Sequence, residues 1–259
     1  MFLVWAILYY PAQGPASEIA FFYAVDADYT ALAAASDQAA QSVKVGSHTI
    51  ARFTMGTHRI FACKMESGAV PSALSAAALL TKFHCDLAFA IGPAGGISDS
   101  ATIGQWFQVT KVVAYQHGSQ GSTGFMLAPN AVIVLPKSES VQIKLPQLFK
   151  DNPQWTVASG ELFVLSLGFR QQLEEDTHAQ AVDMNLYGLA AACADYQVPL
   201  YCWRIISDRA DENAGEDFKT FTSNYDGSGA KAIVEIIRNL PKNPNSPASY
   251  PGLQKLLNR

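Results

Sequence analysis

Two polar stretches in the second half of the chain carry residues that could do chemistry. Asp183-Met184-Asn185 lies where a short apolar strand gives way to an alanine-rich helix, and Ser207-Asp208 ends the apolar strand Val198–Ile206. In parallel α/β proteins ligands bind at the carboxyl ends of strands, so these two strand ends predict a pocket. A carboxyl group there is partly desolvated, which raises its pKa and suits Asp208 to donate a proton near neutrality.

Other interpretations of these residues are open at this level. Asp and Ser are also favoured N-cap residues, so Asp208 could instead begin the next helix. Asp26 and Asp28, at the end of the first apolar strand, could likewise be either functional carboxyl groups or helix N-caps. The stretch Gly92-Pro93-Ala94-Gly95-Gly96 is either a tight turn or a place where backbone without Cβ approaches a flat ligand. It does not have the spacing of a phosphate-binding glycine loop.

Composition excludes several classes of protein. Of the 259 residues, 49% are hydrophobic and 15% are charged, which excludes a disordered chain and suits a sheet buried on both faces. The net charge is −4 at pH 7 and no basic stripe is visible, which argues against a nucleic-acid partner. The 4 cysteines and 5 histidines are scattered without metal-ligand spacing, so we expect buried free thiols, no metal and no cofactor.

The two ends of the chain differ from its middle. Residues 1–18 begin with the almost wholly apolar run Met1–Tyr10 and continue with small residues. This segment has the outline of an export signal without the usual positive start, or of a hydrophobic extension packed on the fold, and we slightly favour export to the periplasm or beyond. It is too short to span a bilayer, which takes about twenty residues. The proline-rich tail 241–259 is expected to lie along the surface.

Strands that alternate with single helices predict one α/β domain over residues 19–240, with a largely parallel or mixed sheet. The expected strands are Glu18–Val25, Ser47–Met55, His58–Met65, Leu87–Ile91, Phe107–Tyr115, Trp155–Leu165 and Val198–Ile206. The expected helices are Tyr29–Ala40, Val70–Phe83, Gln171–His178, Leu186–Tyr196 and Ala230–Leu240. The segments expected to be loops or irregular are His117–Gly124, Pro136–Pro153 and Asp208–Asp217.

Several blocks of the chain resemble, in order, the nucleoside phosphorylase superfamily and most of all its 5′-methylthioadenosine/S-adenosylhomocysteine nucleosidases. These blocks are Ile19–Tyr29, Ile91–Ile97, Ser159–Val164, Ala181–Asn185 and Val198–Asp211. The last block is the most specific, because it contains Arg204-Ile-Ile-Ser-Asp-Arg-Ala-Asp211. The resemblance covers residues 19–240 and implies an α/β fold with a mixed, partly barrel-like central sheet flanked by helices.

The resemblance also implies roles for individual residues. Asp208 stands in the place of the aspartate that protonates the purine at N7, and Ser207 resembles the serine that holds this aspartate. Phe163 resembles the aromatic residue that stacks on the base, and the backbone of Val164 reads the purine edge. Asp28 stands where a glutamate activates the attacking water. Leaving-group protonation and water activation would then act on opposite sides of an oxocarbenium-like sugar.

The resemblance places further residues along the substrate, and one of them departs from the family. Met184 lies against the sugar, and Val25, Ala94 and Gly95 are expected to line the substrate. Asn185 replaces a glutamate that grips the ribose 2′- and 3′-hydroxyls. An amide accepts hydrogen bonds at only one atom and carries no charge, so the sugar contact must differ.

Three functions are compatible with this pattern. The leading one is hydrolysis of the N-glycosidic bond of a purine nucleoside, either methylthioadenosine-like or modified or deoxygenated in its sugar. The alternative is a non-catalytic purine- or nucleoside-binding or storage protein. The departures from the family at Asn185 and at Pro93, which stands where the family has a serine, favour it. Phosphorolysis ranks below both, because the arginines that bind phosphate in the family are missing. The resemblance further implies a homodimer in which the segment around Phe125 lies near the neighbouring pocket.

Overall fold

The computed structural model describes residues 17–122, 124–140 and 144–240. The prediction of an export signal or apolar extension falls on residues 1–18 and therefore lies almost wholly outside the described residues. The predicted surface tail, 241–259, lies wholly outside them. Within the described ranges, no helix has the length and apolar character needed to cross a membrane.

A mixed sheet of ten strands forms the body of the protein. Its strands are β1 (Glu18–Tyr23), β2 (Gln41–Val45), β3 (His48–Met55), β4 (His58–Lys64), β5 (Leu87–Gly96), β6 (Trp106–Ala114), β9 (Val132–Val134), β10 (Gln154–Ser159), β11 (Ala181–Asp183) and β12 (Leu200–Asp208). They follow the order β11-β10-β6-β12-β5-β1-β4-β3-β2, with β9 beside β6. An additional antiparallel pairing of β11 with β5 closes β5, β12, β6, β10 and β11 into a ring. The predicted mixed, partly barrel-like sheet is confirmed.

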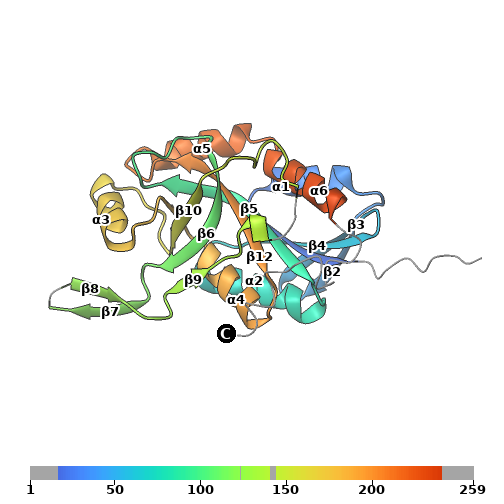
Figure 1. The fold of residues 1–259 in the computed structure, drawn as a ribbon, viewed down its shortest axis with the longest axis horizontal. Coiled ribbons are helices and arrows are strands. Elements are labelled where there is room, and N and C mark those ends of the chain that lie inside the picture. Colours follow the sequence, from blue (N-terminus) through green and yellow to red (C-terminus); the bar gives the residue numbers. More distant parts are fainter. Residues whose placement is uncertain (1–16, 123, 141–143, 241–259) are drawn as a thin grey trace, which may run out of the picture.

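Helices cover both faces of this sheet (Figure 1). Helices α1 (Asp26–Ala35), α5 (Ala214–Asn224) and α6 (Ser228–Asn239) lie on one face, and α2 (Ala69–Lys82) and α4 (Leu186–Asp195) lie on the other. Successive residues of a strand point to opposite faces, so Phe21 packs in the core under α6 while its neighbour Phe22 packs in the core under α2 and α4. Both rings are fully buried, which explains the continuous apolar run of β1.

Strand β5 is longer than predicted, and the difference shapes the pocket. The predicted strand ended at Ile91, but β5 continues through the glycine-rich stretch to Gly96. Pro93 and Ala94 pair with β12, while Gly95 and Gly96 pair with β11. The tight-turn interpretation of this stretch is therefore wrong. Glycine is needed because the neighbouring chains come close: a Cβ on Gly96 would lie 2.8 Å from the Ala101 Cβ.

Three other segments also differ from prediction. The expected loop His117–Gly124 falls mainly in the antiparallel hairpin of β7 (Gly118–Gly121) and β8 (Gly124–Leu127), which projects from the body (Figure 1). Its glycines and polar side chains hide the alternation that signals a strand. The expected loop Asp208–Asp217 contains the first turn of α5, where Glu216 and Asp217 favour a helix N-terminus. The expected strand Trp155–Leu165 ends at Ser159, and a loop leads from there to α3 (Leu167–Thr177).

Candidate active site

A cavity of about 290 Å³ opens at the carboxyl ends of the parallel strands. Its lining residues follow or end β1, β4, β5, β10, β11 and β12, with one more from α5; they are Ala24–Val25, Lys64–Ser67, Pro93–Gly95, Leu162–Val164, Val182–Asn185, Ser207–Asp208 and Phe218. The pocket predicted at the ends of β11 and β12 is present. It also contains Val25, Ala94, Gly95, Phe163, Val164 and Met184, all of which were predicted to line it.

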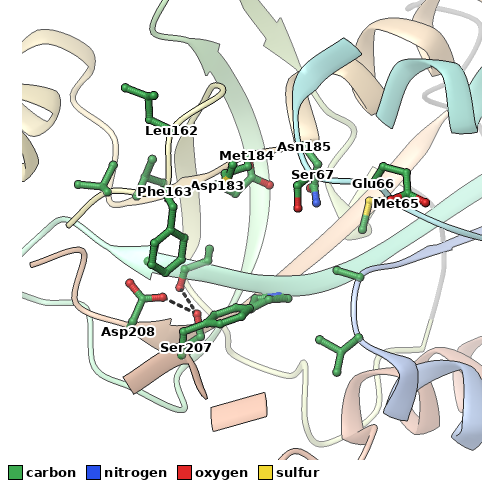
Figure 2. A pocket seen from close by; sticks show the side chains of 18 of the residues that line it. Met65, Glu66, Ser67, Leu162, Phe163, Asp183, Met184, Asn185, Ser207 and Asp208 are labelled. Carbon is green, nitrogen blue, oxygen red and sulfur yellow. Dashed lines mark hydrogen bonds between the residues drawn. The ribbon is translucent and has the colours of Figure 1, made fainter. Parts of the chain in front are cut away.

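The cavity has two chemically different ends (Figure 2). Phe163, Ser207 and Asp208 lie together at one end. Asn185, Ser67, Glu66 and Met65 lie toward the other end, with Met184 between Phe163 and Asn185. We call these the Asp208 end and the Asn185 end.

Asp208 is buried and doubly hydrogen-bonded. Its side chain accepts from the Ser207 hydroxyl at 2.7 Å through Oδ2 and from the Ala210 backbone N–H at 3.0 Å through Oδ1. Burial raises its pKa above the usual range of an aspartate, whereas these two hydrogen bonds favour the ionised form and oppose the rise. Burial therefore makes protonation of this carboxyl group easier than for an exposed aspartate. It does not cap a helix, because the N-cap of α5 is Asn213.

A β-bulge and a glycine position Asp208. The register between β12 and β5 shifts between Ile206 and Asp208, which pair with Ala94 and Gly95. Such a bulge redirects the side chains around it, and here it leaves Ser207 beside the carboxyl group that it contacts. A Cβ on Gly95 would lie 2.8 Å from Asp208 Oδ1. Only glycine at this place lets β5 and the carboxyl group approach so closely.

Two aromatic rings stand over the Asp208 end. The rings of Phe163 and Phe218 meet edge to face, with centroids 5.6 Å apart and an interplanar angle of 72°. Phe163 is 40% exposed, whereas its neighbour Val164 is buried. An exposed ring in a cavity offers an apolar face to a flat ligand. The Asp208 end therefore combines an apolar ring surface with a buried carboxyl group.

A buried ion pair underlies the Asn185 end. The guanidinium group of Arg204 donates to Asp183 Oδ2 from Nε at 3.2 Å and from Nη2 at 3.0 Å, and both side chains are almost fully buried. The same Nη2 donates to Asn185 Oδ1 at 2.9 Å. Asp183 Oδ1 accepts from the Leu186 N–H in the first turn of α4. The Asp183 carboxylate therefore holds both the first turn of α4 and the Arg204 side chain in place.

Asp28 does not line the cavity, in contrast to the position expected for a residue that activates water. It lies in the first turn of α1 with no exposed surface, and its Oδ1 accepts from the Tyr225 hydroxyl at 2.8 Å and from the Ala230 N–H at 3.3 Å. The helix begins directly after Val25, so its first turn points the side chain toward α6 instead of the pocket. Burial raises the pKa of Asp28 to about 7.

One feature connects Asp28 with the Asn185 end. Among the described residues, Asp28 Oδ2 and Arg204 Nη1 have no hydrogen-bond partner, although both are buried. Each group feels the charge of the other. A Cβ on Gly92 would lie within 3.4 Å of Arg204 Nη1 and 3.1 Å of the Ala24 Cβ, so the guanidinium group lies just behind the cavity wall.

The structure adds site residues to which the sequence assigned no role. Phe218 was missed because no helix was predicted between the expected loop, which ended at Asp217, and the expected helix that begins at Ala230. Asp183 and Arg204 were recognised as part of polar strand ends but not as a pair. The detectable signal was an arginine inside an otherwise apolar strand, since a buried charge needs a partner.

Other predictions concern metal ions and thiols. The 4 cysteines are buried and unpaired, which confirms the expectation of free thiols. Over the described ranges, no group of His, Cys, Asp and Glu side chains is arranged to hold a metal ion.

Comparisons with known proteins agree with the fold and with the earlier resemblance. The family model of the phosphorylase superfamily matches residues 18–238. The 5′-methylthioadenosine/S-adenosylhomocysteine nucleosidase of Staphylococcus saprophyticus is 25% identical over 182 residues, which cover 67% of this chain and 78% of that protein.

Solved structures are similar as well. The 5′-methylthioadenosine/S-adenosylhomocysteine nucleosidase of Helicobacter pylori superposes with a TM-score of 0.76 at 21% identity, covering 86% of this chain and 99% of that chain. Futalosine hydrolase of Helicobacter pylori strain 26695 also gives 0.76 at 21% identity, covering 86% and 98%. From the family match, which spans nearly the whole described region, the chain belongs to the phosphorylase superfamily.

Proposed function

We propose that the protein is a purine nucleosidase, which hydrolyses the N-glycosidic bond of a purine nucleoside. The observation that carries the proposal is the buried carboxyl group of Asp208, held by Ser207 at the end of a cavity roofed by Phe163. The similar proteins support it, since they are named as 5′-methylthioadenosine/S-adenosylhomocysteine nucleosidases and a futalosine hydrolase. The substrate would be a nucleoside related to these, or one with a modified sugar.

In this mechanism Asp208 acts on the leaving group. Its carboxyl proton passes to N7 of the stacked purine, so the electron pair of the breaking C–N bond moves into a neutral base and not an anion. The sugar develops oxocarbenium character, and water adds to its anomeric carbon from the opposite face. Proton donation by a positioned side chain contributes about 10²–10⁴-fold to the rate.

The proposal assigns water activation to Asp28. A pKa of about 7 suits a general base, and Oδ2 is the oxygen that Tyr225 and Ala230 leave available. Because Asp28 is fully buried and does not line the cavity, proton transfer would require a local opening that admits water to Oδ2. Asp28→Asn should then slow base release while nucleoside binding persists.

Hydrolysis is favoured over phosphorolysis by the charges in the cavity. Lys64 is the only cationic side chain among the described lining residues, and its Nζ lies 2.7 Å from Asp26 Oδ1. Arg204 is committed to Asp183. A phosphate dianion would find no free guanidinium pair of the kind that binds it in two places.

The direct test is to incubate the purified protein with methylthioadenosine, adenosine, inosine and their deoxy forms and to measure free base. We expect base release without added phosphate, and its loss in Asp208→Asn with binding retained. Thermal stabilisation by nucleosides without any base release would identify a binding or storage protein instead. The uncharged amide of Asn185 and the half-buried Pro93, which both line the cavity and depart from the family pattern, would favour that outcome. Release that requires phosphate would identify a phosphorylase.

We also propose that the protein is a homodimer. The hairpin of β7 and β8 exposes Phe125 and Met126, and Figure 1 shows it standing away from the body. Exposed apolar side chains on a projecting hairpin are typical of a subunit contact. Sedimentation equilibrium would measure the mass directly.

A further inference from the structure

The side-chain amide of Asn185 has one orientation that its surroundings allow. Its partner at 2.9 Å is a guanidinium nitrogen of Arg204, which can only donate a hydrogen bond. The contacting amide atom must therefore be the oxygen, and Nδ2 must point elsewhere. The side chain does not turn back to cap α4, a role that Asp183 performs by accepting from Leu186.

The amide nitrogen is the atom that Asn185 presents to the cavity. Asn185 is half-buried and lines the cavity, whereas Arg204, which holds Oδ1, is almost fully buried and does not line it. Within the described part of the chain, Nδ2 donates to no other residue. Figure 2 shows Asn185 well apart from Asp208, with Glu66 and Met65 beyond it. The two N–H groups are available for a ligand.

A donor and an acceptor at this position differ in whether they need the hydrogen of a sugar hydroxyl group. A carboxylate accepts hydrogen bonds from two neighbouring hydroxyl groups, whereas an amide N–H can only donate to their oxygens. Asp183, two positions before Asn185, already accepts hydrogen bonds from Arg204 through Oδ2 and from Leu186 through Oδ1. Glu66, the other carboxylate at this end of the cavity, follows β4. At position 185 itself, the cavity therefore presents a donor where a carboxylate side chain would present an acceptor.

We propose that Asn185 lets the cavity accept purine nucleosides whose 2′- or 3′-oxygen carries no hydrogen, as in an O-alkylated ribose, as well as those with the free hydroxyl. The inference rests on the proposed function, because it takes the Asp208 end as the base site and the Asn185 end as the sugar site. An ether oxygen satisfies Nδ2 as well as a hydroxyl does, so the hydroxyl hydrogen contributes nothing to binding.

The test measures binding without turnover. The probe is a C-nucleoside isostere of adenosine, whose carbon–carbon glycosidic bond cannot be hydrolysed, with its 2′-O-methyl and 3′-O-methyl derivatives. Calorimetric titration gives the Kd of each probe for the unaltered protein and for Asn185→Asp. This variant keeps size and the Arg204 contact but replaces the donor with an acceptor. Asn239→Asp, an exposed position at the end of α6, carries the same charge change and serves as the control.

We expect at least one O-methyl probe to bind the unaltered protein and Asn239→Asp within about threefold of the parent probe. The Asn185→Asp variant should bind the parent probe more tightly and the same O-methyl probe more weakly. The ratio of the two Kd values should therefore change by roughly tenfold or more. An unchanged ratio would overturn the inference while leaving the nucleosidase proposal intact. If no probe binds the unaltered protein, the nucleoside site itself is wrong and the inference falls with it.

Discussion

The two ends of the cavity are built in different ways. At the Asp208 end, the carboxyl group is held by the residue before it and by the residue two places after it, through Ser207 and Ala210. At the Asn185 end, the amide is held by Arg204, which is 19 positions away on another strand. The first arrangement depends on a local bulge in β12. The second exists only when β11 and β12 are both in place.

In the proposed function, this difference would separate chemistry from substrate selection. The Asp208 end would protonate the base, and the groups that hold its carboxyl group lie in one short stretch of chain. The Asn185 end would contact the sugar through an amide that the buried Arg204–Asp183 pair orients. A buried ion pair is weak evidence for stability by itself, but breaking one is costly because it leaves an unpaired charge. The Asn185 end should therefore be the more fragile of the two.

The largest expected effect comes from removing the guanidinium group at the Asn185 end. Arg204→Met keeps an apolar stem of similar length but leaves the Asp183 carboxylate buried without its partner. We expect the free energy of unfolding to fall by about 3–5 kcal/mol. Denaturant titration followed by circular dichroism measures this loss.

Arg170→Met is the matched control. Arg170 is equally buried and also bonds a carboxylate, but that partner, Asp99, is fully exposed. Water can solvate Asp99 after the change, so we expect a loss clearly smaller than that of Arg204→Met. Equal losses in the two variants would show that the buried carboxylate is not what makes the Asn185 end fragile.

The next largest effect is a pH-dependent change in stability at Asp28, the buried carboxyl group that feels the charge of Arg204. Its pKa is about 7 in the folded protein, against about 3.9 in an unfolded chain. Between these values the folded state holds a proton that the unfolded state has lost, so stability falls as pH rises from about 4 to 7. Asp28→Asn removes this cost while its oxygen still accepts from Tyr225 and Ala230. We expect a gain of roughly 3–4 kcal/mol at pH 8 and none at pH 3.5.

The control is Asp26→Asn, two positions earlier in the same helix. Asp26 is exposed and paired with Lys64 at the surface, so its loss should change stability by less than about 1 kcal/mol at either pH. Thermal unfolding at both pH values measures the two variants. A gain at pH 8 that persists unchanged at pH 3.5 would mean that ionisation of Asp28 is not its source.

Much of the framework could be predicted from sequence, because burial on both faces leaves continuous apolar runs. β1, the first half of β5 and β12 were visible for this reason, and Ser207 and Asp208 stood out as polar residues at the end of such a run. The extension of β5 through Gly92–Gly96 was not visible. Glycine signals a turn as readily as a close approach of chains, and only the pairing with β11 and β12 decides between them.

The Asn185 end could not be predicted for a different reason. Its geometry depends on contacts between residues far apart in sequence, and periodicity carries no information about them. The departure at Asn185 was visible, but which amide atom faces the cavity follows only from the Arg204 contact. The same limit applies to Asp28, whose position depends on α6, the last helix of the described chain.

The smallest expected effect is a shift in the pH dependence of base release, which should differ between a variant at the Asp208 end and a variant at the Asn185 end. Ser207→Ala removes one hydrogen bond that favours the ionised form of Asp208, so the pKa of that carboxyl group should rise further. If protonated Asp208 is the catalytic acid, the alkaline limb of the kcat/KM profile for base release should move to higher pH, by up to about one unit. Ser67→Ala, at the Asn185 end of the same cavity, should leave that limb in place. A shift of equal size in both variants, or a shift to lower pH in Ser207→Ala, would contradict the assignment, because only Ser207 touches the carboxyl group whose titration the limb reports.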